Sequence, residues 1–328
     1  MEDSGDSRLS AKNWKLLESR ADRRARIVCV ANQKGGVGKT TTTVNLAAAL
    51  ALRGHRVLVI DVDPQANATT GLGIDHRALE ASTYELLAGD ASLAGISLPT
   101  AIEGLSCAPA SLNLAGAEIE LVGEMAREMK LAEALTDNVE DYALVLVDCP
   151  PSLGLLTVNA LAAADDLLVP VQCEYYALEG LGQLLRSAER ARRVLNPDLR
   201  VGGFLLTMYD ARTKLSSEVA DEVRGHFGEL VYETVVPRSV RLSEAPSFGE
   251  PVVTLDPSSR GSIAFRLLAT EVEGRYELAR TQDDARELIG SGARAPGGTG
   301  GRGYGTVAPE PRGLDDAWPR RPPWGASS

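Results

Sequence analysis

Two lysines lie on either side of a glycine-rich turn in the segment KGGVGKTT, which spans Lys34–Thr41. Glycines let backbone N–H groups approach phosphate oxygens closely, and an apolar stretch before the turn with a helical pattern after it is the context that a phosphate-binding loop requires. The amino terminus of the following helix would add a favourable dipole. Lys39 would then reach the β- and γ-phosphates of a nucleotide, and the Thr40 hydroxyl would bind Mg²⁺. The segment therefore predicts a site for a nucleoside triphosphate.

This segment departs from the common phosphate-loop pattern G-x-x-x-x-G-K-[ST]. Gln33 stands where the first glycine belongs, and Lys34 follows it. A glycine turn without a ligand is the alternative interpretation, but Gly-Lys-Thr directly after an apolar strand argues against it. Since one lysine is enough for a phosphate loop, Lys34 needs an explanation of its own.

Three aspartates follow apolar segments and could complete such a site. Asp61 and Asp63 come at the end of the segment 56–61, and Asp148 ends the segment 142–148. Open α/β sheets bind ligands at the carboxyl ends of their strands. Side chains two residues apart on a strand point to the same face, so Asp61 and Asp63 could both reach one site. Asp148 follows an apolar run, as does the aspartate that holds Mg²⁺ through water in P-loop proteins. Each could be an ordinary strand-end residue, but together with the lysine loop they favour nucleotide hydrolysis, which needs mainly positioning and electrostatics.

The elements that would position these residues alternate along the chain. The expected strands are mostly continuous runs of Val, Ile and Leu, as in strands covered on both faces, and they span 26–31, 56–61, 142–148, 166–171, 202–207 and 230–236. Helical segments separate them, for example 38–53, which ends at Gly54. This alternation predicts an α/β fold with a doubly wound, mostly parallel sheet of the P-loop NTPase type.

Composition divides the chain into one domain and two tails. We expect the domain over 25–277, a flexible amino-terminal segment over 1–24 and a disordered Gly/Pro/Arg-rich tail over 278–328. The four cysteines are far apart, which predicts buried reduced thiols rather than disulfides or a metal site. No secretory signal or membrane-spanning run is visible, so we expect a soluble cytoplasmic protein. The net charge of −11 argues against the class of DNA-binding proteins that are basic over their whole surface.

KGGVGKT resembles the deviant Walker A loop, KGGxGK[ST], of the ParA/MinD group of P-loop ATPases. The stretches DPQANATTGLG, YYALEGL, LLTMYDARTKLS and VVPRSVRLSEAPSFGEPV resemble the chromosomal ParA (Soj) branch of that group, and the resemblance covers residues 26–274. It implies an ATPase that uses ATP and Mg²⁺.

The resemblance also assigns roles to particular residues. It implies that Lys34 crosses the interface of an ATP-dependent sandwich homodimer to the partner's phosphates, and that Asp63 orients the attacking water, so the catalytic set is Lys34, Lys39 and Asp63. Thr40, Asp61 and Asp148 would support the metal. The nucleotide-binding set is Lys34, Gly35, Gly36, Val37, Gly38, Lys39, Thr40, Thr41, Pro237 and Ser239. The last two fall where ParA proteins contact adenine, although the family usually has asparagine in place of Ser239.

ParA dimers bind DNA without sequence preference when loaded with ATP, and a ParB-type centromere-binding protein stimulates their hydrolysis. The resemblance therefore implies DNA and such a protein as partners, and a cytoplasmic, nucleoid-associated location. The candidate DNA contacts are Arg212, Lys214, Arg238 and Arg241. Because the chain is acidic overall, its positive charge must be concentrated locally to bind a polyanion.

Three alternatives differ in what they require. A MinD-like membrane-cycling ATPase needs a basic amphipathic carboxyl-terminal helix, whereas the last helix expected, near 262–290, is mixed in charge, so we expect no membrane partner. An iron–sulfur carrier needs paired cysteines, whereas the four cysteines of this chain are far apart in the sequence. A nucleotide-gated DNA scaffold with little turnover stays open, although the presence of both Lys34 and Asp63 favours hydrolysis.

Overall fold

The computed structural model describes residues 25–136, 138–174 and 179–278. The two expected tails, 1–24 and 278–328, lie outside the described residues apart from Leu278. The described residues form an eight-stranded sheet in the order β3-β4-β2-β5-β1-β6-β7-β8. Every neighbouring pair of strands is parallel except β3 and β4, which are antiparallel. The prediction of a doubly wound, mostly parallel sheet is therefore confirmed.

The strands are β1 (Arg26–Val30), β2 (Val57–Asp61), β3 (Leu98–Pro99), β4 (Leu105–Ala108), β5 (Leu144–Asp148), β6 (Asp166–Gln172), β7 (Arg200–Tyr209) and β8 (Val231–Pro237). The α-helices are α2 (Lys39–Ala51), α3 (Asn67–Gly71), α4 (Thr83–Ala88), α5 (Leu93–Ile96), α6 (Leu114–Glu120), α7 (Lys130–Leu135), α8 (Leu155–Ala163), α9 (Glu179–Val194), α10 (Lys214–Phe227), α11 (Val240–Glu244), α12 (Val252–Leu255) and α13 (Arg260–Tyr276). Short 3₁₀ turns are η1 (Leu121–Gly123), η2 (Arg127–Met129), η3 (Gly228–Leu230) and η4 (Ala245–Phe248).

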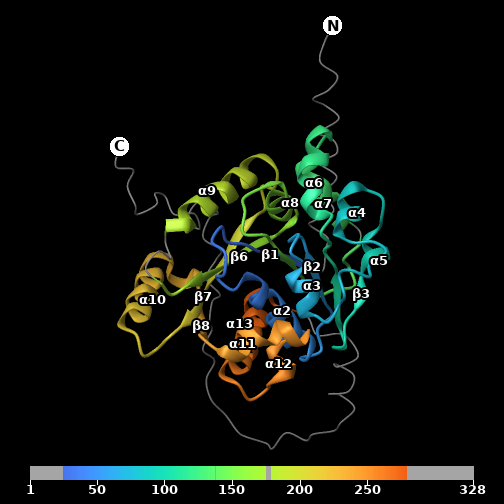
Figure 1. Cartoon of the computed structure of the whole chain (residues 1–328). Helices are drawn as coiled ribbons and strands as arrows, with labels where there is room; N and C mark the ends of the chain where they lie inside the picture. Colours follow the sequence, from blue (N-terminus) through green and yellow to red (C-terminus); the bar gives the residue numbers. More distant parts are fainter. Residues whose placement is uncertain (1–24, 137, 175–178, 279–328) are drawn as a thin grey trace, which may run out of the picture. The chain divides into compact units, whose positions relative to one another are not determined.

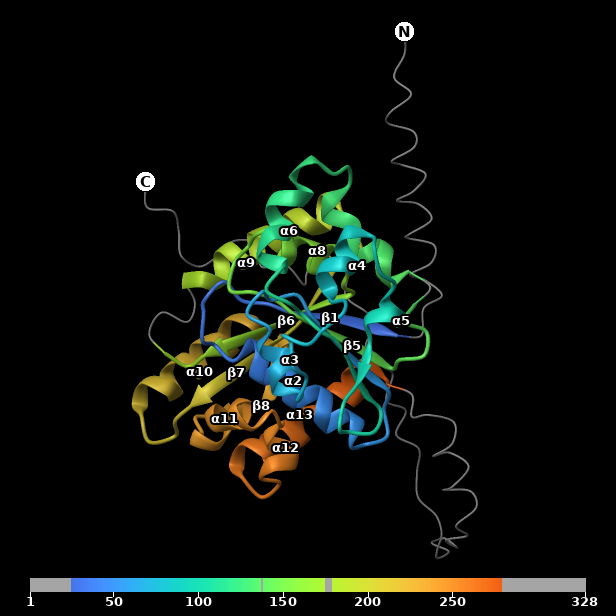
Figure 2. The same ribbon diagram turned by 45° about the vertical axis from the view of Figure 1, so that its right-hand side comes forward.

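Helices cover both faces of the sheet (Figure 1, Figure 2). One layer holds α2, α11, α12 and α13, and the opposite layer holds α4, α7, α8 and α9. Burial on both faces explains why β2 and β5 are apolar without interruption up to their final aspartates.

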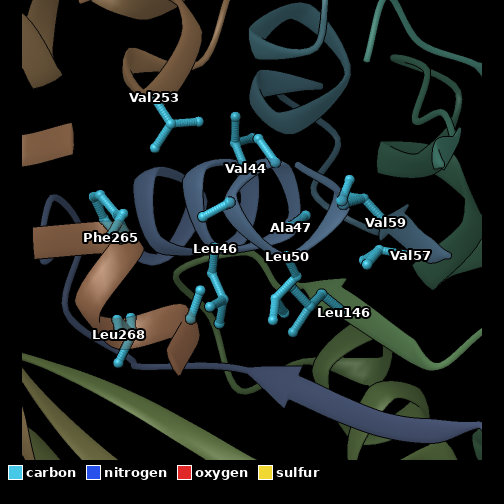
Figure 3. Packing of buried hydrophobic residues seen from close by; sticks show 14 of the residues in the cluster. Val44, Leu46, Ala47, Leu50, Val57, Val59, Leu146, Val253, Phe265 and Leu268 are labelled. Carbon is cyan, nitrogen blue, oxygen red and sulfur yellow. The ribbon is translucent and has the colours of Figure 1, made fainter. Parts of the chain in front are cut away.

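The packing around α2 fixes the helix that follows the lysine loop (Figure 3). Leu46 and Leu50 of α2 lie over the sheet beside Leu146 of β5, and α13 contributes Phe265 and Leu268 to the same cluster. Most residues of α2 are buried, as expected for a helix held between a sheet and a further helix layer. The loop before α2 therefore rests on a rigid element.

Strand register brings the predicted acidic residues to one edge of the sheet. Asp61, the last residue of β2, pairs with Asp148, the last residue of β5. Asp148 also pairs with Val30, after which the chain enters the lysine loop. Since β5 lies between β1 and β2, the ends of these three strands meet at the carboxyl edge.

Some expected elements differ from the structure. The strands β3 and β4 were not expected, and α2 is shorter at both ends than the predicted 38–53. The last helix, expected near 262–290, begins at Arg260 and ends at Tyr276. The four cysteines are free and buried, as predicted. Within the described ranges, no helix combines the length and apolar character needed to cross a bilayer.

Candidate nucleotide site

Side chains from neighbouring strands hold the lysine loop at both ends. The Asn32 side chain donates to the Pro170 carbonyl at 2.7 Å and accepts from the backbone N–H of Lys34 at 3.0 Å. At the other end, the Thr207 hydroxyl of β7 donates to the Val37 carbonyl at 2.8 Å. The loop is thus attached to β6 and β7 as well as to its own strand and helix.

The glycines of the loop adopt backbone conformations that favour glycine. Gly36 has φ of 72° and Gly38 has φ of 91°, and Gly38 precedes α2 without a side-chain cap. Among the described residues, the backbone N–H groups of Gly35–Gly38 have no protein acceptor. Uncapped N–H groups at a helix amino terminus are a ready site for an anion, so the loop fits the phosphates of a nucleotide.

Lys39 is buried at the start of α2, with 6 % of its surface exposed. Its Nζ donates a long hydrogen bond of 3.4 Å to the Lys34 carbonyl. Burial lowers the pKa of Lys39, and the nearby Asp148 and Asp63 carboxylates oppose this effect. A buried ammonium with so weak a protein partner is well suited to a phosphate ligand.

Asp148 lies fully buried beside two hydroxyls of α2. Its carboxylate accepts hydrogen bonds from Thr40 at 2.8 Å and from Thr43 at 3.0 Å. Burial raises the pKa of Asp148, and the charge of Asp61 raises it further. A divalent cation would favour the ionised form, and a hydroxyl next to a carboxylate is a suitable donor set for Mg²⁺, so the residues present fit this ion.

Asp61 is fully buried and already bound to protein donors. It accepts from the backbone N–H of Asp63 at 3.1 Å, and from the N–H and hydroxyl of Thr69 at 2.9 and 2.7 Å. Burial raises the pKa of Asp61 as well. These bonds hold the Asp63 turn against α3, which is a positioning task, and a place for Asp61 in the metal shell stays a prediction.

Asp63, the residue expected to orient the attacking water, lies in the turn after β2. It is 5 % exposed and close enough to Lys39 to affect its pKa. Its Oδ1 accepts from the backbone N–H of Gln65 at 3.0 Å. The structure thus places Asp63, Lys39 and Asp148 together, as the sequence predicted.

The second lysine has a different environment. The Lys34 side chain is 39 % exposed, and its Nζ lies 3.8 Å from Oε2 of Glu174, just beyond β6. Lys34 and Lys39 therefore differ in burial and in electrostatic partners, although one short loop carries both.

A pocket beside the first turn of α2 holds the residues expected at the adenine end. Its volume is about 260 Å³, and Pro237 and Ser239 line it together with Thr41. Gly38 and Thr207 line the same pocket, so it adjoins the lysine loop. The location fits a nucleotide base, and the contacts themselves stay a prediction.

The four candidate DNA contacts lie in the segments that follow β7 and β8. The backbone N–H of Arg238 donates to the Tyr209 carbonyl at 3.0 Å, which joins these two segments. Each basic side chain is at least 58 % exposed and has an acidic neighbour. The pairs are Arg212 with Asp210, Lys214 with Glu218, Arg238 with Glu174, and Arg241 with both Glu244 and Asp256. The four basic side chains are thus matched by five carboxylates, so their positive charge is neutralised locally.

Sequence reasoning missed several residues that organise the site: Asn32, Thr43, Thr69, Thr207 and Glu174. Thr43 lies about one helical turn after Thr40, so its position on the same face could have been predicted. The contacts of Asn32, Thr207 and Glu174 depend on which strands become neighbours. Those of Thr69 with Asp61 depend on how α3 folds back, and the local sequence indicates neither.

A parallel sheet with a phosphate loop after β1, an uncapped helix amino terminus and a threonine–aspartate pair for Mg²⁺ defines a P-loop nucleoside triphosphatase. Comparison with known proteins gives the particular family. Residues 25–201 match the AAA domain family. The sporulation initiation inhibitor protein Soj of Bacillus subtilis is 53 % identical over 247 residues, which cover 75 % of this chain and 98 % of that protein. The chromosome partitioning protein ParA of Myxococcus xanthus is 50 % identical over 250 residues, with 76 % and 88 % covered.

A solved structure of another protein has a similar fold. Cobyrinic acid a,c-diamide synthase from Mycobacterium smegmatis, with a bound ATP analogue and magnesium, is similar with a TM-score of 0.68 and 40 % identity, covering 77 % of this chain and 96 % of that one. The chain belongs to the ParA/Soj family of chromosome-partitioning ATPases. It is an ATPase, and its cofactors are ATP and Mg²⁺.

Proposed function

We propose that this chain partitions DNA by cycling between a free form and an ATP-bound sandwich dimer on the nucleoid. The observation that carries the proposal is the contrast between the two loop lysines. Lys39 is buried beside Asp148 and Asp63, whereas Lys34 is exposed and contacts Glu174. A lysine placed outside its own phosphate site is available to a second subunit.

Within one subunit, the loop N–H groups and Lys39 bind and orient the phosphates, and Thr40 with Asp148 would hold Mg²⁺, which would supply charge to neutralise the phosphates. Asp63 orients the attacking water. Lys34 of each subunit adds positive charge to the other subunit's phosphates in the manner of an arginine finger, which in other phosphoryl-transfer proteins is worth about 10³–10⁵ in rate. ATP then joins two subunits because neither site is complete alone.

Double-stranded DNA binds without sequence preference to the patch formed by Arg212, Lys214, Arg238 and Arg241. Dimerisation doubles this patch, so DNA affinity follows the nucleotide state. The acidic neighbours and the net charge of −11 predict weak binding that releases few counterions, so that affinity falls with salt along a shallow slope and binding is lost at high salt.

A ParB-type DNA-bound protein stimulates hydrolysis and releases the dimer. A basic segment of such a partner would find charge complementarity on an acidic ATPase. The cycle takes place in the cytoplasm, and the ATP-bound form is located on the nucleoid.

The test is DNA binding by Asp63→Ala, which blocks hydrolysis, on a non-specific duplex with ATP or ADP across a salt series. We expect binding with ATP alone, loss of binding at high salt, and loss on adding Lys34→Ala. Arg212→Ala should weaken binding. Arg200→Ala, an exposed arginine at the opposite end of β7, is the matched control and should not. No binding in either nucleotide state, with the variant folded and loaded with ATP, would contradict the proposal.

A further inference from the structure

One carboxylate lies between the exposed loop lysine and an arginine of the candidate DNA patch. Oε2 of Glu174 is 3.8 Å from Nζ of Lys34, and Oε1 of Glu174 accepts from Nη2 of Arg238 at 2.8 Å. Glu174 follows β6, which neighbours β1, the strand that leads to Lys34. Arg238 directly follows β8 and is bound to the end of β7. The sheet order thus brings three separate segments to one carboxylate.

We propose that Glu174 is a positioning residue for Lys34, and that it holds this lysine on its own subunit until a dimer forms. This inference rests on the proposed function, because it requires that Lys34 act across a dimer interface. For Lys34 to reach a partner's phosphates, its contact with Glu174 must break. The contact therefore opposes dimerisation and stabilises the free form.

The strength of the contact suits such a restraint. Both side chains are about two-fifths exposed, and exposed ion pairs shift an equilibrium by a factor of about 1.5–5. A symmetric dimer breaks two of these contacts, one per subunit, so the factors multiply to about 2–25 in the dimer dissociation constant. Bound phosphates can overcome a restraint of this size, yet it is large enough to set the ATP and protein concentrations at which dimers form.

Arg238 has a second role in this arrangement. When Lys34 leaves, Arg238 stays bound to Glu174, so no unpaired carboxylate is left. Arg238 thereby makes release of Lys34 easier, and it is less available to DNA than a simple surface arginine. A residue that only contacted DNA would not affect dimerisation in the absence of DNA.

The experiment is sedimentation velocity of the full chain without DNA, with Mg²⁺ and a non-hydrolysable ATP analogue, over a range of protein concentrations. We expect Glu174→Gln to lower the dimer dissociation constant by about 2–25-fold, with the difference shrinking at high salt. Arg238→Ala should raise the constant, and the double variant should behave like Glu174→Gln. Glu103→Gln, an exposed glutamate in the β3–β4 turn, is the matched control and should leave the constant unchanged.

The outcomes separate this inference from the proposed function. If the unmodified chain forms no dimer with the analogue, or if Lys34→Ala dimerises as well as the unmodified chain, both fail. If the unmodified chain dimerises through Lys34 but Glu174→Gln dimerises equally or less well, only the role of Glu174 is overturned. An Arg238→Ala variant that dimerises normally and loses only DNA affinity would overturn the role given to Arg238.

Discussion

The two ends of the parallel sheet hold their buried charges in different ways. At the amino ends of β1 and β6, Arg26 donates to Asp166 at 2.6 Å, and the aspartate is almost fully buried. Nearby, Arg275 donates to the Gly202 carbonyl at 2.7 Å and lies 4.0 Å over the ring of Tyr232. Each of these cations has a protein partner that is already in place.

At the carboxyl ends of β2 and β5, the protein brings two aspartates together instead. Asp61 and Asp148 are fully buried neighbours, and their hydrogen-bond donors are neutral hydroxyls and N–H groups. Burial raises the pKa values of Asp61 and Asp148, as it also does for Asp166, but at the amino edge the charge of Arg26 opposes this effect. Charge is thus balanced by a protein ion pair at the structural edge, whereas at the functional edge three buried aspartates face one buried lysine, Lys39, and a bound cation would complete the balance. Substitutions at the two ends should therefore have opposite effects on stability and activity.

The largest effect is expected at the carboxyl edge, from Lys39→Met, which keeps the length of the side chain and removes its charge. We expect kcat/KM for ATP hydrolysis to fall by about 10²–10³-fold, because a charge aimed at the phosphates is lost. The free energy of unfolding without nucleotide should not decrease, since a buried cation is removed. Phosphate release and urea unfolding measure the two quantities, and a large loss of stability with normal activity would contradict the comparison.

At the amino edge, Asp166→Ala is expected to lower stability and to leave ATP hydrolysis nearly unchanged. This change leaves the partly buried Arg26 without its carboxylate and should lower the free energy of unfolding by about 3 kcal/mol. KM for ATP should stay within about two-fold of the unmodified value, because the edge does not contact the nucleotide. Urea unfolding is the measurement, and Arg26→Ala combined with Asp166→Ala should cost less than the sum of the two single changes.

A smaller effect is expected from pH in the absence of nucleotide and Mg²⁺. Because burial raises the pKa of Asp148, the folded chain keeps a proton that the unfolded chain releases above its ordinary carboxyl pKa of about 4. Stability then falls as pH rises, and with the pKa of Asp148 raised to about 8, lowering the pH from about 8 to about 6 should raise the free energy of unfolding by about 2 kcal/mol. Asp148→Asn should remove most of this dependence, and an equal slope in both proteins would show that other groups cause it.

The smallest effect is expected from Thr207→Val, which removes the hydroxyl that holds the Val37 carbonyl. Losing one hydrogen bond of about 1 kcal/mol should raise KM for ATP about three- to five-fold with little change in kcat. Steady-state kinetics would show this, with Thr254→Val as a control because its hydroxyl donates to the carbonyl of Pro251, the residue just before α12. A fall in kcat alone would mean that Thr207 does more than hold the loop.

Local sequence predicted those features that depend on local physics. The six longer strands, the helix after the loop and the grouping of Asp63, Lys39 and Asp148 follow from apolar runs, glycine placement and strand ends. The strand β3 has only two residues, and β4 has four that include a serine and a cysteine, so neither carries a recognisable pattern. The strand β4 forms because β2 offers an edge on which to pair, and β3 in turn pairs with β4.

The site residues that sequence could not assign are those defined by contacts over long separations. Asp61 was expected in the metal shell, but its bonds to Thr69 depend on how α3 folds back. Similarly, the four exposed basic residues were predicted from two segments, which the Arg238–Tyr209 backbone bond joins, while the acidic partner of Arg238 comes from a segment 64 residues away. Charge patterns in the sequence indicate where cations gather, but they do not indicate how far neighbouring acids neutralise them.

The position of β1 in the middle of the sheet has a consequence for synthesis of the chain. Ile27 of β1 pairs with Val145 of β5, so β1 cannot pair with this neighbouring strand until about 120 further residues have been translated. At about 5–20 residues per second, this interval is roughly ten seconds. During that time the apolar segment around Val28 and Val30 has no sheet to join, and its hydrophobic surface is available to chaperones or to neighbouring nascent chains. Folding of this ATPase on the ribosome is therefore expected to be late and dependent on protection of its first strand.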